Sequence, residues 1–291
     1  MRHVPIALTV ALCACVSAAQ QPSGSRGRIV SAADLAAALN DPALALLHVV
    51  DRSSPYERGH IPGARPVRYS EVVVDGPGAV GAELPPAEQI ERVFEEAGVS
   101  DASRVVVYGT TTTAARVFFT LDAAGHRNVS LLDGGLRAWQ AGGYPLETGA
   151  APAGERGAFT ATLAAGRIAT ADFVQQTRSA IALVDVRPDD EYTGADGGMG
   201  MHAAGHIEGA RQLPWNELVG PDGRFLSDDQ LRAQLAAAGA APGKPVVSYC
   251  MVGLRASVVY FIARHLGLDA RLYDGSIVDW GRRKLPTRMG R

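Results

Sequence analysis

The chain has 291 residues, a length that exceeds one typical domain and predicts two. Hydrophobic residues make up 47% and charged residues 20%, as in globular proteins with a sizeable core. The formal net charge of −2 provides no broad positive surface for nucleic acid or for an anionic membrane. We therefore expect neither partner, and affinity for an anionic substrate has to come from a local site.

The first 19 residues have the layout of a secretory signal peptide. Arg2 and His3 precede an apolar run over residues 4–16, and small residues at 17–19 provide a cleavage site. The run is too short for a membrane-spanning helix. We predict cleavage and a periplasmic or secreted protein with no stable membrane association. The less favoured alternatives are a retained anchor and a lipoprotein box at residues 12–15, in which Cys13 is unusual.

Cysteine usage becomes informative once the signal peptide is set aside. Two of the three cysteines, Cys13 and Cys15, lie within it, so Cys250 is the only thiol expected in the mature chain. A lone cysteine in an exported protein forms no disulfide framework, and it is either a reactive thiol or an inert buried one.

The rest of the chain is a duplicated unit. A Gly-His-Ile-x-Gly-Ala segment occurs at residues 59–64 and at 205–210, following Asp51 in the first copy and Asp185 in the second. Three later pairs share an offset of 141 residues: Gly109 with Cys250, Asp133 with Asp274, and Trp139 with Trp280. A constant offset indicates an internal repeat. The two aspartates differ in offset from the two histidines, so we expect twelve extra residues in a loop of the second copy.

Each copy alternates short apolar runs with segments of helical spacing. The apolar runs predict buried strands at 45–50, 104–108, 129–132, 182–186, 245–249 and 270–273, and helices are predicted at 87–97, 114–124, 227–238 and 254–266. Such alternation predicts a parallel sheet with helices on both faces. We therefore predict an α/β protein of two domains, at 28–147 and 167–291, joined by an Ala-, Gly- and Pro-rich linker at 148–166.

The strand before Cys250 leads directly into a short loop and then into a helix. In an open α/β sheet, chemistry takes place at the carboxyl ends of the strands. Backbone amides at a helix N-terminus favour negative charge and therefore stabilise a thiolate. Gly253 lets the backbone curl around the sulfur, and Arg255 adds a cation with a fork of donors for an anion. The Cys-x-x-Gly-x-Arg pattern predicts a nucleophilic cysteine rather than an inert one.

These motifs resemble those of the rhodanese family of sulfurtransferases. The repeated Gly-His-Ile segment, the loop at 250–255, and Tyr-Asp-Gly-Ser at 273–276 followed by Trp280 carry the resemblance. It implies two tandem rhodanese-like domains and a catalytic Cys250 that takes the outer sulfur of thiosulfate as a persulfide and releases sulfite. The sulfur then passes to a thiophilic acceptor such as cyanide, a thiol or a protein thiol, and no metal or organic cofactor is needed.

The resemblance also implies roles for the residues around the cysteine. Asp185 and Arg187 are expected to brace the loop through a salt bridge. The substrate-binding residues that it implies are Arg255, Met251, Val252, Gly253, Leu254 and Ala256.

Two features of the sequence bear on the substrate. Four residues separate Cys250 from Arg255, whereas phosphatases of the same architecture have five, so the smaller loop favours sulfur over phosphate. Glu191 stands where mitochondrial-type tandem enzymes place a donor-binding arginine, and the loop lacks the Cys-Gly-Ser-Gly form of mercaptopyruvate enzymes. Thiosulfate is the predicted donor. The alternatives are 3-mercaptopyruvate and a sulfur carrier that turns over no small donor.

The first copy has lost the chemistry. Its loop begins at Gly109 in place of the cysteine and continues with four threonines, so it has neither the nucleophile nor the cation of the second copy. We predict an inactive domain that stabilises the pair and forms one wall of the cleft. His206 could serve as a general base, but His60 occupies the same motif in the inactive copy, so we predict a structural role for both.

Overall fold

The computed structural model describes residues 28–74, 79–151, 154–196 and 203–291. The predicted signal peptide lies outside these ranges, as do most of the extra residues of the second copy. Among the residues described, no helix is long and apolar enough to cross a membrane.

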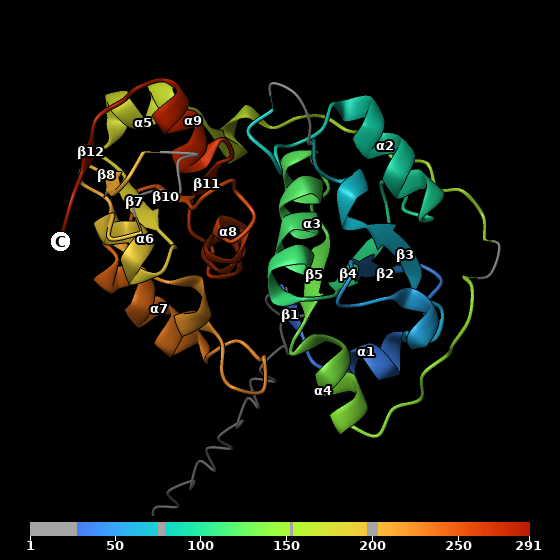
Figure 1. The fold of residues 1–291 in the computed structure, drawn as a ribbon. Helices are drawn as coiled ribbons and strands as arrows, with labels where there is room; N and C mark the ends of the chain where they lie inside the picture. The colour runs from blue at the N-terminus through green and yellow to red at the C-terminus, as the bar shows by residue number, and fades with distance from the viewer. Residues whose placement is uncertain (1–27, 75–78, 152–153, 197–202) are drawn as a thin grey trace, which may run out of the picture.

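The first half is a five-stranded parallel sheet of strand order β1-β5-β4-β2-β3. Its strands are β1 (Ile29–Val30), β2 (Leu44–Val50), β3 (Arg65–Arg68), β4 (Arg104–Tyr108) and β5 (Val129–Leu132). Its helices are α1 (Ala32–Ala38), α2 (Ala87–Glu96), α3 (Thr111–Ala123) and α4 (Gly135–Ala141). Alternate strand residues join two separate apolar clusters, one with α2 and α3 and one with α1 and α4. Helices therefore cover both faces of the sheet (Figure 1).

The second half repeats this arrangement, with strand order β6-β11-β10-β7-β9 and all strands parallel. Its strands are β6 (Ile168–Ala169), β7 (Ala182–Asp185), β9 (Arg211–Gln212), β10 (Val246–Tyr249) and β11 (Ala270–Tyr273). Its helices are α5 (Ala171–Thr177), α6 (Asp189–Thr193), α7 (Asp228–Ala237), α8 (Ala256–His265) and α9 (Ser276–Arg282). A two-stranded antiparallel ladder joins β8 (His206–Ile207) to β12 (Thr287–Arg288). The predicted α/β class with two parallel sheets is confirmed.

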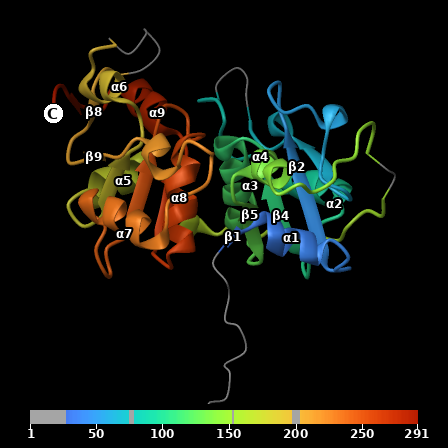
Figure 2. The same ribbon diagram turned by 90° about the horizontal axis from the view of Figure 1, so that it is seen from below.

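Helices α3 and α8 lie side by side between the two sheets and join the halves (Figures 1 and 2). Their aromatic rings interlock edge to face, with ring centroids 4.8 Å apart for Phe118 and Phe261 and 5.0 Å apart for Phe119 and Tyr260. One apolar cluster therefore runs through both halves. Edge-to-face pairs of this kind add about 1 kcal/mol each beyond the area that they bury.

A buried carboxylate lies at the far end of the same helix pair. Asp122 of α3 accepts hydrogen bonds from the Tyr260 hydroxyl at 2.5 Å and from Arg264 Nε at 3.0 Å, both on α8. Burial opposes the charge of Asp122, but the hydrogen bonds from Arg264 and Tyr260 prevail and lower its pKa. The interface is thus apolar in the middle and ionic at its end.

The sheet registers correct one sequence-based correspondence. We matched Asp185 to Asp51, but Asp185 pairs with Tyr249 in β10, and the residue that pairs with Tyr108 in β4 is His48. His48 therefore occupies in the first sheet the position of Asp185 in the second. The motif search failed here because both halves have an aspartate near the strand end, and only the register distinguishes them.

The segment predicted as a linker lies against the first half over its described residues 154–166. The Gly157 amide donates to Glu95 O at 2.8 Å, the Thr162 amide donates to Ala124 O at 2.9 Å, and Phe159 is buried against Phe94. One aromatic residue in a Gly- and Ala-rich stretch is thus enough to anchor it to the core.

Candidate active site

Cys250 lies at the carboxyl end of β10, where the chain turns into the loop before α8. Its side chain is 1% exposed, and its Sγ accepts a hydrogen bond from the Gly253 amide at 3.2 Å. The N-terminal end of α9 holds the start of this loop. Ser276 Oγ accepts a hydrogen bond from the Cys250 amide at 3.1 Å, and the Ile277 amide donates to Cys250 O at 3.1 Å. The sulfur is therefore fixed at the bottom of a loop whose backbone turns around it.

Gly253 is required at this point of the loop for two reasons. Its φ of +90° lies in the left-handed region, which a side chain disfavours. A Cβ there would also lie 2.8 Å from Asp274 O and 2.9 Å from Asp274 Oδ1, closer than packed atoms approach. The loop can therefore close around the sulfur only with glycine at this position.

The other loop residues are arranged along the same turn. Met251, Val252 and Leu254 are half-buried, and Ala256 is fully buried at the start of α8. Val252 approaches the first half, since a Cβ on Gly81 would lie 3.8 Å from its Cγ1. Their predicted contact with substrate stays a prediction.

Arg255 precedes the first residue of α8 and is half-buried. Its Nη1 and Nη2 atoms bond the two carboxylate oxygens of Glu191, each at 2.7 Å. Burial disfavours the charge of Arg255, but the hydrogen bonds that it donates to Glu191 and the field of Cys250 raise its pKa. Arg255 is therefore a permanent cation that interacts with both Cys250 and Glu191, which lies in α6. The pairing of Arg255 with Glu191 was not predicted from the sequence.

Asp185 and Arg187 form a fully buried ion pair beside the strand that carries Cys250. Arg187 bonds Asp185 through Nε at 2.9 Å and through Nη2 at 2.6 Å, and Nη2 also donates to Gly205 O at 2.8 Å. The pair lies next to Tyr249, the neighbour of Cys250, because Asp185 and Tyr249 are ladder partners. The salt bridge expected from the resemblance is thus present, and it ties β7 to the segment before β8.

The first half contributes a cation to the surroundings of the loop at residues 250–255, which we call the active loop. Arg116 of α3 is fully buried and donates to Asp274 Oδ1 at 2.5 Å, and the Leu84 amide donates to Asp274 Oδ2 at 2.6 Å. Asp274 is the residue that packs against Gly253. The first half therefore holds in place the residue that packs under the loop at Cys250. The signal for this pair in the sequence was an arginine on the apolar face of a predicted helix, because a buried arginine needs an acidic partner.

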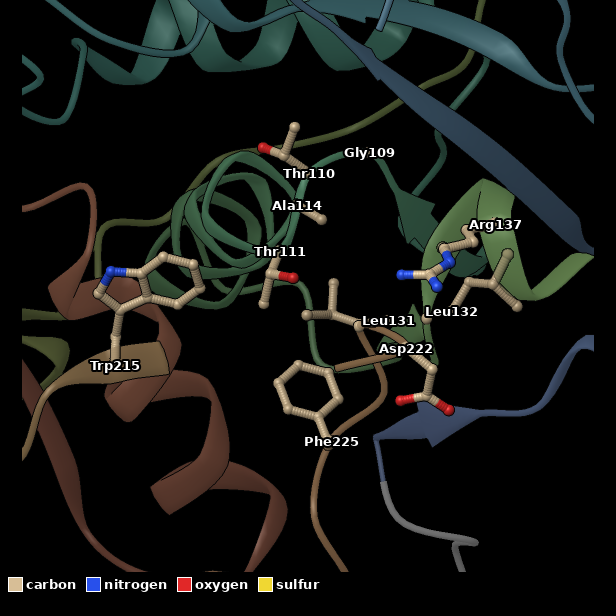
Figure 3. Close-up of a pocket in the computed structure, with 13 residues that line it drawn as sticks. Gly109, Thr110, Thr111, Ala114, Leu131, Leu132, Arg137, Trp215, Asp222 and Phe225 are labelled. Carbon is tan, nitrogen blue, oxygen red and sulfur yellow. The ribbon is translucent and has the colours of Figure 1, made fainter. Parts of the chain in front are cut away.

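Figure 3 shows the loop of the first half that corresponds to the active loop, at a cavity of about 320 Å³. Gly109, Thr110 and Arg137 line it from the first half, and Trp215 and Phe225 line it from the second. Thr110 caps α3, since its hydroxyl accepts the Thr113 amide at 3.3 Å. No side chain caps α8. The helix of the first half thus has a side-chain cap on the Thr113 amide, whereas α8 has no side-chain cap.

The two motif histidines have the same surroundings. His206 is buried, its Nδ1 lies 3.0 Å from Tyr192 O, and its ring stacks on Tyr192 with centroids 3.9 Å apart. His60 has the same contacts with Tyr56, at 3.0 Å and 3.7 Å. Because the same geometry occurs with and without a catalytic loop, it supports a structural role for both rings.

Comparison with known proteins agrees with this geometry. A family model described as rhodanese-like domain matches residues 31–142 and again residues 170–283. The chain therefore belongs to the rhodanese family of sulfurtransferases and carries the domain twice.

Similar proteins span nearly the whole chain. Sulfur carrier protein TtuD of Thermus thermophilus is 32% identical over 259 residues, which cover 84% of this chain and 90% of that protein. A Mycobacterium tuberculosis protein named "Putative thiosulfate sulfurtransferase SseB" is 32% identical over 270 residues, 88% of this chain and 95% of the relative. The crystal structure of SseA from Escherichia coli, described as a 3-mercaptopyruvate sulfotransferase, superposes with a TM-score of 0.76 at 27% identity, covering 86% of this chain and 98% of that one.

Proposed function

We propose that this protein transfers the outer sulfur of thiosulfate to a thiophilic acceptor through a persulfide on Cys250. One observation carries the proposal: Cys250 Sγ is held by the Gly253 amide at the uncapped N-terminus of α8, beside the cation Arg255. Amides and a fixed cation around a buried sulfur stabilise a thiolate and the negative charge of a persulfide. Relatives named as sulfur carrier and thiosulfate sulfurtransferase support the same chemistry.

The reaction has two displacement steps. The Cys250 thiolate attacks the outer sulfur of thiosulfate, the S–S bond of the donor breaks, and sulfite leaves with the electron pair. Cyanide or a thiolate then attacks the outer sulfur of the persulfide, and the Cys250 thiolate leaves unchanged. Because the cysteine is covalently loaded between the two steps, the scheme predicts ping-pong kinetics.

Two alternatives rest on specific observations. The likeness to SseA favours 3-mercaptopyruvate as donor, and the pairing of Arg255 with Glu191 favours a carrier that turns over thiosulfate slowly. A comparison of kcat/KM for the two donors separates the first alternative. A persulfide that forms on Cys250 without steady turnover identifies the second.

The decisive experiment measures thiocyanate formed from thiosulfate and cyanide. Cys250→Ser should lower the rate by about a thousandfold or more, because no other nucleophile is held in the loop. Thr110→Ser, a conservative change in the loop of the first half, should stay within about twofold of wild type because it keeps the helix cap. Thiosulfate alone should add one sulfur atom to the Cys250 peptide by mass spectrometry. Equal turnover by Cys250→Ser would end the proposal.

We also propose that the protein acts outside the cytoplasm. The basic start, apolar run and small residues of positions 1–19 support export. Expression of the full chain in a Gram-negative host, followed by N-terminal sequencing of the periplasmic fraction, should give a mature end close to residue 20. A full-length product in the cytoplasm would contradict export.

A further inference from the structure

The charges around Cys250 are arranged in pairs. Arg187 is bound by Asp185, Arg116 by Asp274 and Arg255 by Glu191. Each of these three arginines is thus matched by a carboxylate. A thiolate on Cys250 adds a further negative charge, so a small anion entering the loop meets the amides of the loop and no net positive charge from these side chains.

The Glu191 pair differs from the other two in its position. Asp185 and Asp274 are buried, Asp185 beside Tyr249 and Asp274 against Gly253. Glu191 is less deeply buried and contacts Arg255, an arginine that also interacts with Cys250. Both Nη atoms of Arg255 are engaged at 2.7 Å, which is the bidentate geometry that a carboxylate or sulfonate donor would itself adopt. A donor anion that uses this pair of Nη donors therefore has to displace Glu191, and one that binds the other N–H groups of Arg255 meets the negative charge of Glu191.

We propose that Glu191 determines the charge specificity of this site by competing with donor anions for Arg255. Donor anions such as thiosulfate then bind weakly, with a raised KM, whereas sulfur donors that carry no charge near the transferred sulfur do not meet this competition. Glu191 acts through Arg255 and is a positioning residue. The inference rests on the proposed reactivity of Cys250 and specifies which donors reach it efficiently.

The same competition has a consequence for the product. When the S–S bond of a donor anion breaks, the leaving anion is released more readily if Glu191 returns to Arg255. Glu191 therefore weakens binding of a donor anion and of its anionic product together. Its removal should lower KM for thiosulfate more than it changes kcat.

The test uses two alkylating reagents of similar size and different charge, iodoacetate and iodoacetamide. They react with Cys250 whether or not the protein turns over any donor, and peptide mapping restricts the readout to this cysteine. In Glu191→Gln, the ratio of the iodoacetate rate to the iodoacetamide rate should rise about tenfold, the scale of one charge in a partly screened site. The KM for thiosulfate should fall by a similar factor, with kcat within about threefold.

Glu208→Gln is the matched control because it removes an exposed carboxylate from the same half. Glu208 pairs with Arg178 at 3.4 Å, and both side chains are exposed. The control should leave the alkylation ratio within about twofold, the size expected for a screened surface charge. Glu191→Ala, measured beside Glu191→Gln, should raise the ratio in the same direction.

The outcomes distinguish the two proposals. An unchanged alkylation ratio in both Glu191 variants overturns the charge competition, and so does an equal slowing of both reagents, which would indicate a structural role alone. If the ratio rises while no variant turns over thiosulfate, the charge competition holds and the proposed thiosulfate activity fails.

Discussion

The two halves of this protein repeat one fold and differ at the loop that follows the central strand, where Gly109 stands in the first half and Cys250 in the second. In each, the central strand leads into a loop and then into a helix, at Gly109 in the first half and at Cys250 in the second. The helix of the first half is capped by Thr110, whereas the helix after Cys250 has no side-chain cap. The comparison teaches that two helices in corresponding positions can differ in whether a side chain caps their N-terminal amides, and an uncapped N-terminus leaves donors that favour negative charge.

The loop at Gly109 also leaves little space for a nucleophilic side chain. A Cβ on Gly109 would lie 3.0 Å from Val49 Cβ and 3.1 Å from Val49 O. A cysteine at this position therefore requires Val49 to shift by a few tenths of an ångström. A single substitution does not restore the lost site.

The halves differ again in their buried polar groups. Asp185 and its ion pair with Arg187 lie beside Tyr249, while His48 lies at the corresponding position beside Tyr108 and stacks on its ring, with centroids 4.6 Å apart. One half thus stabilises its central strands with paired charges and the other with a neutral ring. Substitutions in either half test this difference.

The largest effect is expected from Asp185→Asn. The substitution leaves Arg187 buried without its counterion, which should cost about 3–5 kcal/mol of unfolding free energy. Asp51→Asn in the first half should cost about 1 kcal/mol, because the half-exposed Asp51 only accepts hydrogen bonds from Ser53 and Ser54. Urea unfolding followed by circular dichroism measures both. Equal losses of unfolding free energy in the two variants would show that the buried ion pair contributes no more than the hydrogen bonds of Asp51.

A somewhat smaller effect is expected from Arg116→Met, which leaves Asp274 without its cation. The loss should be about 3 kcal/mol, and Cys250 should react with iodoacetamide at a changed rate because Asp274 packs against Gly253. Arg116→Lys should not restore the bidentate contact.

Arg137→Met provides the matched control for Arg116. Arg137 also reaches across the halves, donating to Pro221 O at 2.9 Å, but it is exposed. Its loss should cost about 0.5–1 kcal/mol and leave Cys250 reactivity unchanged. If both variants change Cys250 reactivity alike, Arg116 has no particular role at the loop.

The smallest effect is a pH dependence confined to the first half. Burial, followed by the charge of His60, lowers the pKa of His48 from 6.5 to about 4. The unfolded chain then binds more protons between these values, so stability should fall as the pH drops below 6.5, by roughly 2 kcal/mol at pH 5. His48→Met should flatten this part of the stability profile. An unchanged slope in the variant would assign the acid sensitivity to other groups.

The sequence predicted the central strands to within a residue because long apolar runs and the repeat offset indicate the same elements. The two-residue edge strands β1, β6 and β9 were not predicted, since so short a segment carries no periodicity. The loop at Cys250 was predictable from local spacing. The pair of Arg116 with Asp274 was not, because its members are 158 residues apart and meet only when the halves pack.

The contacts between the halves are reciprocal. The Leu84 amide of the first half binds Asp274, and the Phe225 amide of the second half binds Asp133 at 2.9 Å. In a duplicated chain of this kind, corresponding substitutions in the two halves can have unequal effects. A substitution in the first half can therefore reach the second: a change at Arg116 removes a contact to Asp274, which packs against the loop that follows Cys250. A chain cut between the halves would separate the cysteine from part of its own support.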